Sequence, residues 1–280
     1  MFKYWLYRVS YFLVSLFSLK VSYAISDRIF DLVYVLNFKD RHSVSRNFKK
    51  ILPEGCPVGR QDREMFRNFG RYLVDLLSLK EILKPENIHT QIKIENEQRL
   101  RDCLKKGKGA IVLTAHVGSW ELGAAFLGVL GFPLSVIALE HRNKRVNQFF
   151  NEQRNIFGLK VVTPKAAMRR GVSHLKNNGI LAIVGDRDFL GTGVIMDFFG
   201  YPTRIPKGAA YFCQRVGSPI VPVFLVRNDD NTFTLKIEEP INPEIKDDKK
   251  DENVDLEPIM RKIVSVIENQ IRAQPSQWLM

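Results

Sequence analysis

The fold is decided by one short stretch of the sequence, IVLTAHVGSWEL at residues 111–122. It opens on a short apolar run, which predicts a buried strand over residues 111–114. A turn that contains Gly118 follows, and a helix is predicted over residues 122–130. A strand that passes through a short turn into a helix is the repeating unit of α/β sheets.

The same alternation of apolar runs and amphipathic segments continues along the chain beyond this stretch. Further strands are predicted at residues 134–139, 160–162, 180–184, 221–226 and 233–237. Helices are predicted between them at residues 143–157, 165–177 and 206–216, with a last helix at residues 254–273. We therefore expect an α/β fold whose core, residues 109–240, is a central mixed sheet flanked by helices.

The part of the chain before this core is predicted to be helical. Residues 41–108 are polar, whereas residues 1–40 form a hydrophobic and amphipathic helical region. The longest uncharged run there, residues 9–19, is too short for a bilayer span of about 20 residues, and a signal peptide is disfavoured because its cleavage site, at residues 21–24, would be weak. We expect one or two helices that lie in the membrane interface as a peripheral or single N-terminal anchor. The alternative is a helical hairpin packed on the rest of the chain.

Composition narrows the classes of partner. The chain has 280 residues, 45% of them hydrophobic, which excludes a disordered chain and a multi-span transporter. Its net charge is +12, and such a field attracts nucleic acid, an anionic membrane surface or an acidic partner. No nucleic-acid-binding motif is present, so we expect no nucleic acid partner. The 3 cysteines and 5 histidines have no metal-ligand spacing, so we predict no metal site.

The turn after the first core strand carries the chemistry. In open α/β sheets ligands bind where strands end and helices begin, which is where His116 and Glu121 lie. We predict that Glu121 reaches back to accept the Nδ1–H of His116, which leaves Nε2 free to take a proton from a hydroxyl. No G-x-S-x-G motif is present, so the substrate hydroxyl itself would attack. The alternative is that His116 is a turn residue and Glu121 complements the helix dipole.

Four more residues are candidates for the same site. Asp186 follows the apolar run 180–184, so it is expected at the end of a strand beside the site. Arg154 has the guanidinium geometry to bind a phosphate or a carboxylate through two parallel hydrogen bonds. Arg187 and Lys207 are candidates to contact an anionic group. The alternatives are a salt-bridged turn at residues 186–188 and solvated surface positions for Arg154 and Lys207.

Several short segments, taken in order and spacing, carry a resemblance to a known family. They are Arg46-Asn47-Phe48, Pro53-Glu54, Asn68-Phe69-Gly70-Arg71-Tyr72, the block from His116 to Glu121, Arg154, Gly185-Asp186-Arg187-Asp188, Phe198-Phe199-Gly200 and Gln277-Trp278. The sequence resembles the bacterial lipid A biosynthesis (lauroyl/myristoyl) acyltransferases, which belong to the lysophospholipid acyltransferase superfamily. That superfamily also includes phosphatidylinositol mannoside acyltransferases.

The resemblance implies an acyltransferase domain over residues 41–280. It implies transfer of a fatty acyl chain from acyl-carrier protein or acyl-CoA to a glycolipid hydroxyl, as in lipid A and lipopolysaccharide biosynthesis. It implies His116 as general base, Glu121 as its partner, Arg154 and Asp186 as supporting residues, and no cofactor besides the acyl donor. Members of that family usually continue past the tryptophan with a short aromatic and basic tail, whose contacts this sequence is expected to lack.

The expected location is the cytoplasmic side of the inner membrane, beside its anionic surface. Three alternatives stay open. The first is an acyltransferase for phosphatidylinositol mannoside or another lysophospholipid or glycolipid. The second is a thioesterase that uses water as the acceptor. The third is a binding protein for anionic lipid or nucleic acid, which the net charge of +12 alone would support.

Overall fold

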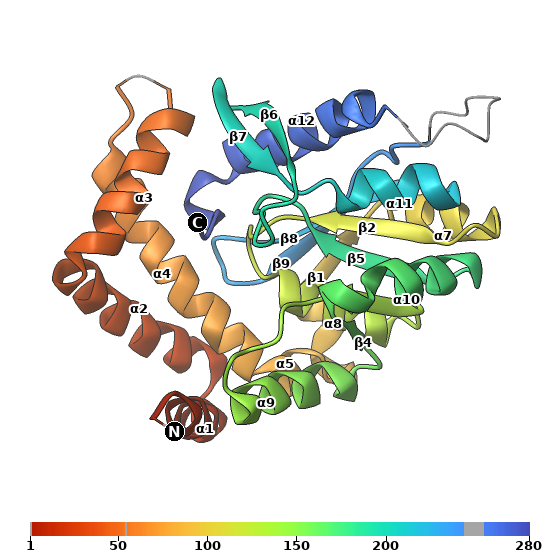
Figure 1. The fold of residues 1–280 in the computed structure, drawn as a ribbon. Helices are drawn as coiled ribbons and strands as arrows, with labels where there is room; N and C mark the ends of the chain where they lie inside the picture. The colour runs from red at the N-terminus through yellow and green to blue at the C-terminus, as the bar shows by residue number, and fades with distance from the viewer. Residues whose placement is uncertain (1, 54, 244–254) are drawn as a thin grey trace.

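The computed structural model describes residues 2–53, 55–243 and 255–280 (Figure 1). In this part of the chain a seven-stranded sheet has the order β1-β9-β8-β2-β5-β3-β4. Its strands are β1 (Ile92–Glu95), β2 (Ala110–Thr114), β3 (Leu134–Ile137), β4 (Lys160–Val162), β5 (Ile180–Val184), β8 (Ile220–Arg227) and β9 (Phe233–Ile237). Every neighbouring pair is parallel except the antiparallel pair β8–β9. The predicted fold class, an α/β fold with a mixed sheet, is therefore confirmed.

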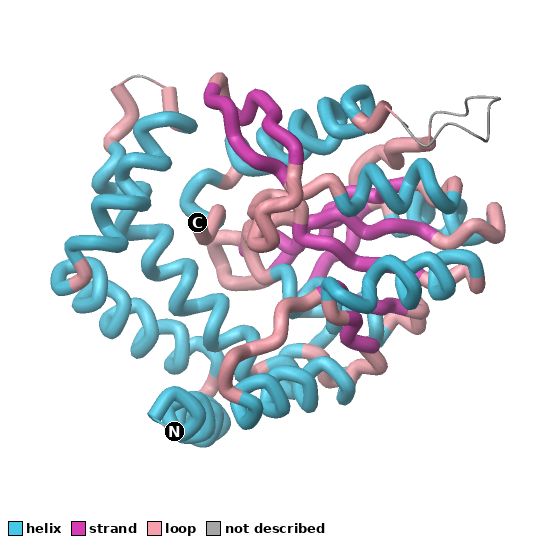
Figure 2. The backbone as a smooth tube through the Cα atoms, in the orientation of Figure 1, coloured by secondary structure: helices cyan, strands magenta, loops and turns pink. Residues whose placement is uncertain are grey.

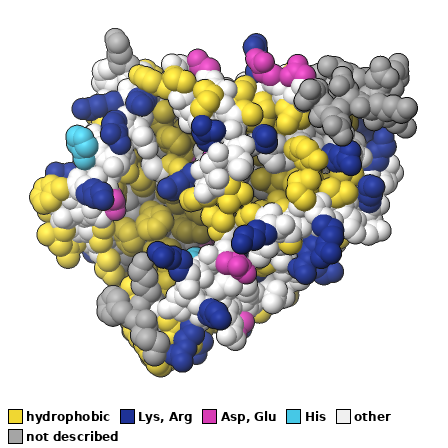
Figure 3. All heavy atoms as spheres, in the orientation of Figure 1, with side chains coloured by type: hydrophobic (Ala, Val, Ile, Leu, Met, Phe, Trp, Pro, Cys, Tyr) yellow, Lys and Arg dark blue, Asp and Glu magenta, His cyan; other side chains and the backbone are white. Residues whose placement is uncertain are grey.

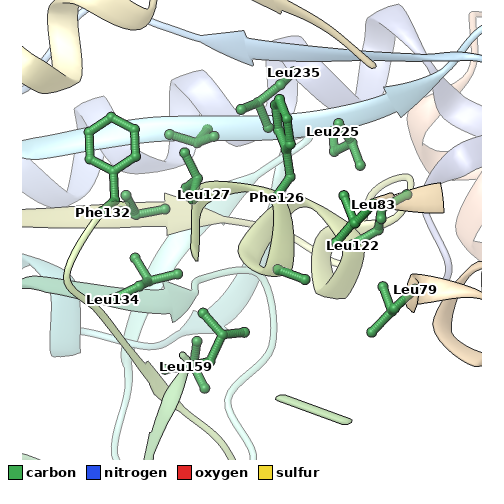
Figure 4. Packing of buried hydrophobic residues seen from close by; sticks show 14 of the residues in the cluster. Leu79, Leu83, Leu122, Phe126, Leu127, Phe132, Leu134, Leu159, Leu225 and Leu235 are labelled. Carbon is green, nitrogen blue, oxygen red and sulfur yellow. The ribbon is translucent and has the colours of Figure 1, made fainter. Parts of the chain in front are cut away.

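Helices cover both faces of the sheet. They are α7 (Glu97–Lys105), α8 (Trp120–Val129), α9 (Lys144–Ile156), α10 (Pro164–Lys176), α11 (Gly208–Val216) and α12 (Glu257–Ala273). Alternate residues of β2 point to opposite faces, so Val112 packs in the cluster under α8, whereas Ile111 and Leu113 pack in the cluster under α11 and α12. Figure 4 shows Leu122 and Phe126 of α8 directed at the strands on one face.

Three strands were missed by the sequence prediction. The hairpin β6 (Val194–Phe198) and β7 (Tyr201–Ile205) stands apart from the main sheet. Its two-residue turn has positive φ at Phe199 and Gly200, the geometry that suits a tight hairpin. Strand β1 lies in the region predicted to be helical, because four residues beside long charged helices give a weak period-2 signal. Glu54 and Val254, at the edges of predicted segments, lie outside the described residues.

The N-terminal part is helical, as predicted. It consists of α1 (Phe2–Leu16), α2 (Leu19–Leu36), α3 (Phe38–Ile51) and α4 (Val58–Leu77), followed by the short helices α5 (Leu79–Ile82) and α6 (Pro85–Gln91). Helices α2 and α4 pack closely at Gly70, where a Cβ would lie 2.3 Å from Cδ2 of Phe30. The same two helices are joined by ion pairs from Asp27 to Arg71 and from Asp31 to Arg67. None of the described helices is long and apolar enough to cross a bilayer.

The last described residues return to the middle of the molecule. After α12 and a 3-10 turn, η1 (Pro275–Gln277), the chain lies between α4 and the sheet (Figures 1 and 2). Asn68 of α4 donates a hydrogen bond to the carbonyl oxygen of Ser276 at 3.0 Å. The loops that follow several strands gather on this side of the sheet (Figure 2). The candidate active site lies among them.

Candidate active site

His116 and Asp186 meet because their strands are neighbours. Strands β2 and β5 run parallel, with Thr114 opposite Val184, and each candidate residue comes two positions after its strand ends. Both side chains therefore emerge at the same edge of the sheet. Nδ1 of His116 lies 2.8 Å from Oδ1 of Asp186, and the backbone N–H of His116 donates to Oδ2 at 3.1 Å. The carboxylate thus fixes both the ring and the backbone of His116.

The predicted hydrogen bond from His116 to Glu121 was wrong, because Asp186 occupies that position. Glu121 instead accepts from Nε of Arg154 at 3.0 Å, and its other oxygen accepts from Nη2. Successive helix residues point about 100° apart. Since Trp120 faces His116 in the first turn of α8, Glu121 is turned away toward α9. The expected two-bond contact of Arg154 is therefore with Glu121, in a pair whose side chains are only 10% and 15% exposed.

Aromatic rings surround the imidazole. The ring of Trp120 meets His116 edge-on with centroids 4.9 Å apart, and Phe189 lies on another side at 6.1 Å. Tyr72 of α4 stacks on Trp120 at 4.2 Å, and burial raises the pKa of the Tyr72 hydroxyl well above its usual value. The His116 side chain is 17% exposed, and Nε2 has no hydrogen-bond partner among the described residues. This nitrogen is free to accept a proton.

The Asp186 carboxylate is ionised although it is fully buried. Burial raises its pKa, but hydrogen bonds from His116 and Trp278 and the attraction of His116 more than offset this, so the net pKa lies below the ordinary value. A buried carboxylate that keeps its charge beside an imidazole stabilises the imidazolium form. The geometry therefore suits a general base, because the positive charge that the imidazole gains with the proton is compensated by the carboxylate.

The turn between β2 and α8 is held by its backbone. Gly118 has a φ of 63°, and a Cβ there would lie 2.1 Å from the carbonyl oxygen of Leu225. The N–H groups of Gly118 and Ser119 donate to Gln277 and Leu225 at 2.9 and 3.0 Å. Only glycine tolerates both this conformation and this approach. The turn is consequently fixed against β8 on one side and residue 277 on the other.

The remaining two predicted residues lie on the surface. The exposed guanidinium of Arg187 stacks over the ring of Phe189 at 4.5 Å, which places it at the edge of the site. Lys207 is exposed at the N-cap of α11. Within the described ranges, Lys207 forms no hydrogen bond or ion pair with any other predicted site residue. The structure thus joins His116 to Asp186 and Glu121 to Arg154, but leaves Lys207 apart.

Sequence reasoning missed the buried polar groups behind the site. Trp278 donates its indole Nε1–H to Oδ2 of Asp186 at 3.0 Å. Arg227 is paired with Asp75, which also accepts from the Tyr23 hydroxyl at 2.6 Å. Arg227 is the last residue of an apolar strand, and Asp186 lies just after one. A polar residue at the end of an apolar run, the pattern that identified Asp186, could therefore have identified Arg227 as well. Tyr72 and Trp278 lie in two of the segments that carry the family resemblance, but the sequence assigns neither residue a role in the site.

One face of the molecule is hollowed. Figure 3 shows the surface hollowed between the N-terminal helices and the core, with hydrophobic side chains inside and Lys and Arg around the rim. A separate cavity of about 600 Å³ lies along α9 and the loop before it, and His116 does not line it. Asn151 lines this cavity and also accepts a hydrogen bond from Arg154 at 3.4 Å. Within the described residues no group of His, Cys, Asp or Glu could hold a metal ion.

Fold and site together define an α/β protein with a histidine–carboxylate pair suited to activating a hydroxyl group. The chain belongs to the bacterial lipid A biosynthesis acyltransferase family, which it matches over residues 1–280. The resemblance inferred from the motifs is thereby confirmed, and the enzyme class is confirmed at the level of the family.

The chain is also similar to curated phosphatidylinositol mannoside acyltransferases. It is 27% identical to the one from Mycobacterium tuberculosis over 161 residues, covering 55% of this chain and 51% of that protein. It is 26% identical to the one from Mycolicibacterium smegmatis over 137 residues, covering 48% and 45%. The chain spans about half the length of the curated relatives it matches.

Proposed function

We propose that the protein is a membrane-associated O-acyltransferase that moves a fatty acyl chain from a thioester to a glycolipid hydroxyl. One observation carries the proposal. In a member of an acyltransferase family, the imidazole of His116 has Nδ1 on the buried Asp186 carboxylate, and no described residue bonds its Nε2. The donor is acyl-carrier protein or CoA loaded with the acyl chain, and no further cofactor takes part.

The proposed reaction is a single displacement. Nε2 of His116 takes the proton of the acceptor hydroxyl while that oxygen attacks the thioester carbonyl carbon. The tetrahedral intermediate collapses as the carbon–sulfur bond breaks, and the leaving thiolate takes the proton back from the imidazolium. Asp186 stabilises the imidazolium between the two steps. No acyl group is attached to the protein at any stage.

In this proposal Glu121 and Arg154 hold neighbouring side chains in place. Their buried pair ties the first turn of α8 to α9, which holds Trp120 against His116. Arg187 and Lys207 are exposed cations that attract the phosphate groups of a donor or acceptor. Glu121 is thus a positioning residue in place of the direct partner that the sequence predicted.

The N-terminal helices support association with a membrane. One side of α1 packs on α9, where Tyr7 meets Phe150 with ring centroids 5.1 Å apart. The other side of α1 and the outer side of α2 expose large apolar residues: Trp5, Leu6, Val9, Phe12, Leu13, Leu16, Ile25, Ile29, Leu32, Val35 and Leu36. An exposed apolar face of this size is typical of a helix lying in a bilayer interface. The positive charge favours the anionic cytoplasmic surface of the inner membrane.

The family match and the curated relatives suggest two different glycolipid acceptors. The family description points to a lipid A precursor, and the mycobacterial relatives point to phosphatidylinositol mannoside. Both present sugar hydroxyls at a membrane surface, so the same mechanism serves either. We favour the lipid A precursor because the family match spans residues 1–280, whereas the first of these relatives aligns with 55% of the chain.

The test is a reconstituted reaction. The full chain is incubated with acyl-carrier protein or CoA thioesters and with vesicles that contain either acceptor, and products are identified by mass spectrometry. We expect an acylated glycolipid from the parent protein and from His89→Ala, an exposed histidine on α6, but none from folded His116→Ala. Free fatty acid as the sole product would indicate a thioesterase, and no acyl transfer to either acceptor would refute the proposal.

A further inference from the structure

The segment formed by residues 277–279 runs antiparallel to the turn that carries His116. The N–H of Gly118 donates to the carbonyl oxygen of Gln277 at 2.9 Å, and the N–H of Leu279 donates to that of His116 at 2.8 Å. The second of these bonds is made by the backbone of His116 itself, and the first by the residue two positions further on. Val117 and Trp278 face each other between them as an isolated bridge. The segment therefore adds a short strand beside the active-site turn.

Trp278 reaches from this segment to the carboxylate. Its side chain is buried, packs edge-on against Phe198, and donates Nε1–H to Oδ2 of Asp186 at 3.0 Å. The same oxygen accepts from the backbone of His116, while the other oxygen meets Nδ1. A carboxylate rotates readily about its last bond, and the indole N–H restricts that rotation. Trp278 thus holds the plane of the carboxylate so that one of its oxygens faces the imidazole.

Gln277 anchors the segment at its other end. Its carboxamide accepts from the N–H of Arg227 at 2.9 Å and donates to the carbonyl oxygen of Arg227 at 2.8 Å. The Arg227 guanidinium is buried against Asp75 of α4, and Asp75 holds Tyr23 of α2. Each of these groups is buried and has a partner, which makes the anchor rigid. The segment is fixed to β8 and touches the ends of β2 and β5.

We propose that Trp278 and Gln277 are positioning residues of the acyl-transfer site: Trp278 orients the Asp186 carboxylate toward His116, and Gln277 fixes the segment from which Trp278 acts. This inference rests on the proposed function, since the geometry being held is that of its general base. Neither side chain touches the reacting atoms. Their effect is on the rate of the chemical step and not on substrate binding.

The first variant is Trp278→Phe, which keeps an aromatic ring against Phe198 and removes the indole N–H. Loss of a hydrogen bond to a buried charge predicts a fall in kcat of about 10- to 100-fold with KM unchanged. The second variant is Gln277→Met, of similar shape, for which we expect a smaller fall in kcat. Its matched control is Gln98→Met, an exposed position on α7. Circular dichroism and thermal unfolding verify that each variant is folded.

A spectroscopic measurement separates positioning from mere stability. In ¹⁵N-histidine-labelled protein the Nδ1–H proton of His116 is identified by its loss in His116→Ala. We expect this signal to shift or broaden in Trp278→Phe and to stay unchanged in Gln98→Met. An unchanged signal together with parental kcat in folded Trp278→Phe would overturn the inference. If the parent transfers no acyl chain, the proposed function fails, and the imidazole spectrum still decides whether Trp278 orients the pair.

Discussion

Oδ1 of Asp186 lies 2.8 Å from Nδ1 of His116, at the ends of two parallel strands that are neighbours in the sheet. In the proposed mechanism this relationship gives Asp186 the task of stabilising the imidazolium, which the sequence assigned to Glu121. Asp186→Asn keeps the shape of the side chain but removes its charge and favours the wrong tautomer of the imidazole. We expect kcat to fall by about 10³-fold or more.

The measurement is the initial rate of acyl transfer at saturating donor. Asp229→Asn, in an exposed loop, is the matched control and should keep the parental rate. Glu121→Gln should lower the rate less than Asp186→Asn does, because in the described part of the chain Glu121 bonds Arg154 and forms no hydrogen bond with the imidazole. A larger loss of rate in Glu121→Gln than in Asp186→Asn would favour the pairing of Glu121 with His116 that the sequence predicted.

The pair Glu121–Arg154 predicts a stability effect. Arg154→Met leaves the Glu121 carboxylate without its partner in a largely buried place, so we expect the free energy of unfolding to fall by about 3–5 kcal/mol. The double variant Glu121→Leu with Arg154→Met should be more stable than Arg154→Met alone. Urea denaturation measures both. Additive effects of the two substitutions would contradict the pairing, and Arg261→Met, in an exposed pair on α12, should change little.

The lowered pKa of Asp186 predicts how stability depends on pH. Its folded-state pKa lies below that of the unfolded chain, so its ionisation stabilises the fold above about pH 4. This contribution is lost as the pH falls through the folded pKa. The difference in unfolding free energy between the parent and Asp186→Asn should therefore shrink as the pH falls from about 6 to about 3. A difference that is constant over this range would show that the carboxylate is not stabilised in its charged form.

The apolar face of α2 predicts membrane binding. Ile29 and Leu32 are 53% and 59% exposed, and burying such a side chain in the interface strengthens binding by about tenfold. Ile29→Ser combined with Leu32→Ser should weaken binding to anionic vesicles by about 100-fold without lowering Tm. Sedimentation with vesicles is the measurement. Met168→Ser, at an apolar residue on α10 that is 48% exposed, should bind like the parent.

Local patterns in the sequence predicted the core well. Between β2 and β9, each strand or helix that the sequence predicted begins and ends within two residues of its prediction, because apolar runs and amphipathic segments alternate clearly there. The hairpin β6–β7 was missed because half of its strand residues are exposed and Asp197, Pro202 and Arg204 keep its apolar runs short. The proposed division at residue 40 stays a prediction.

The sequence predicted that His116 and Asp186 lie at strand ends, and the structure places them there, but their pairing was not predicted. His116 and Asp186 both follow apolar strands, and that local signal identified them. Which strands become neighbours depends on packing across the whole sheet, so nothing local could reveal that β5 would lie beside β2. The nearest acidic residue in sequence, Glu121, was chosen instead. For the same reason the sequence did not reveal that Arg227 pairs with Asp75 or that Trp278 bonds Asp186, because each partner comes from a distant segment.

The hydrogen bonds that hold the Asp186 carboxylate join distant parts of the chain. His116 is 70 residues from Asp186, and Asp186 is 92 residues from Trp278. Helices form within about a microsecond, whereas contacts of this separation form slowly during folding. A refolding chain should regain its circular dichroism before it regains activity. The arrangement proposed for catalysis is therefore a product of the finished fold, and we expect a partly folded chain with all of its helices to be inactive.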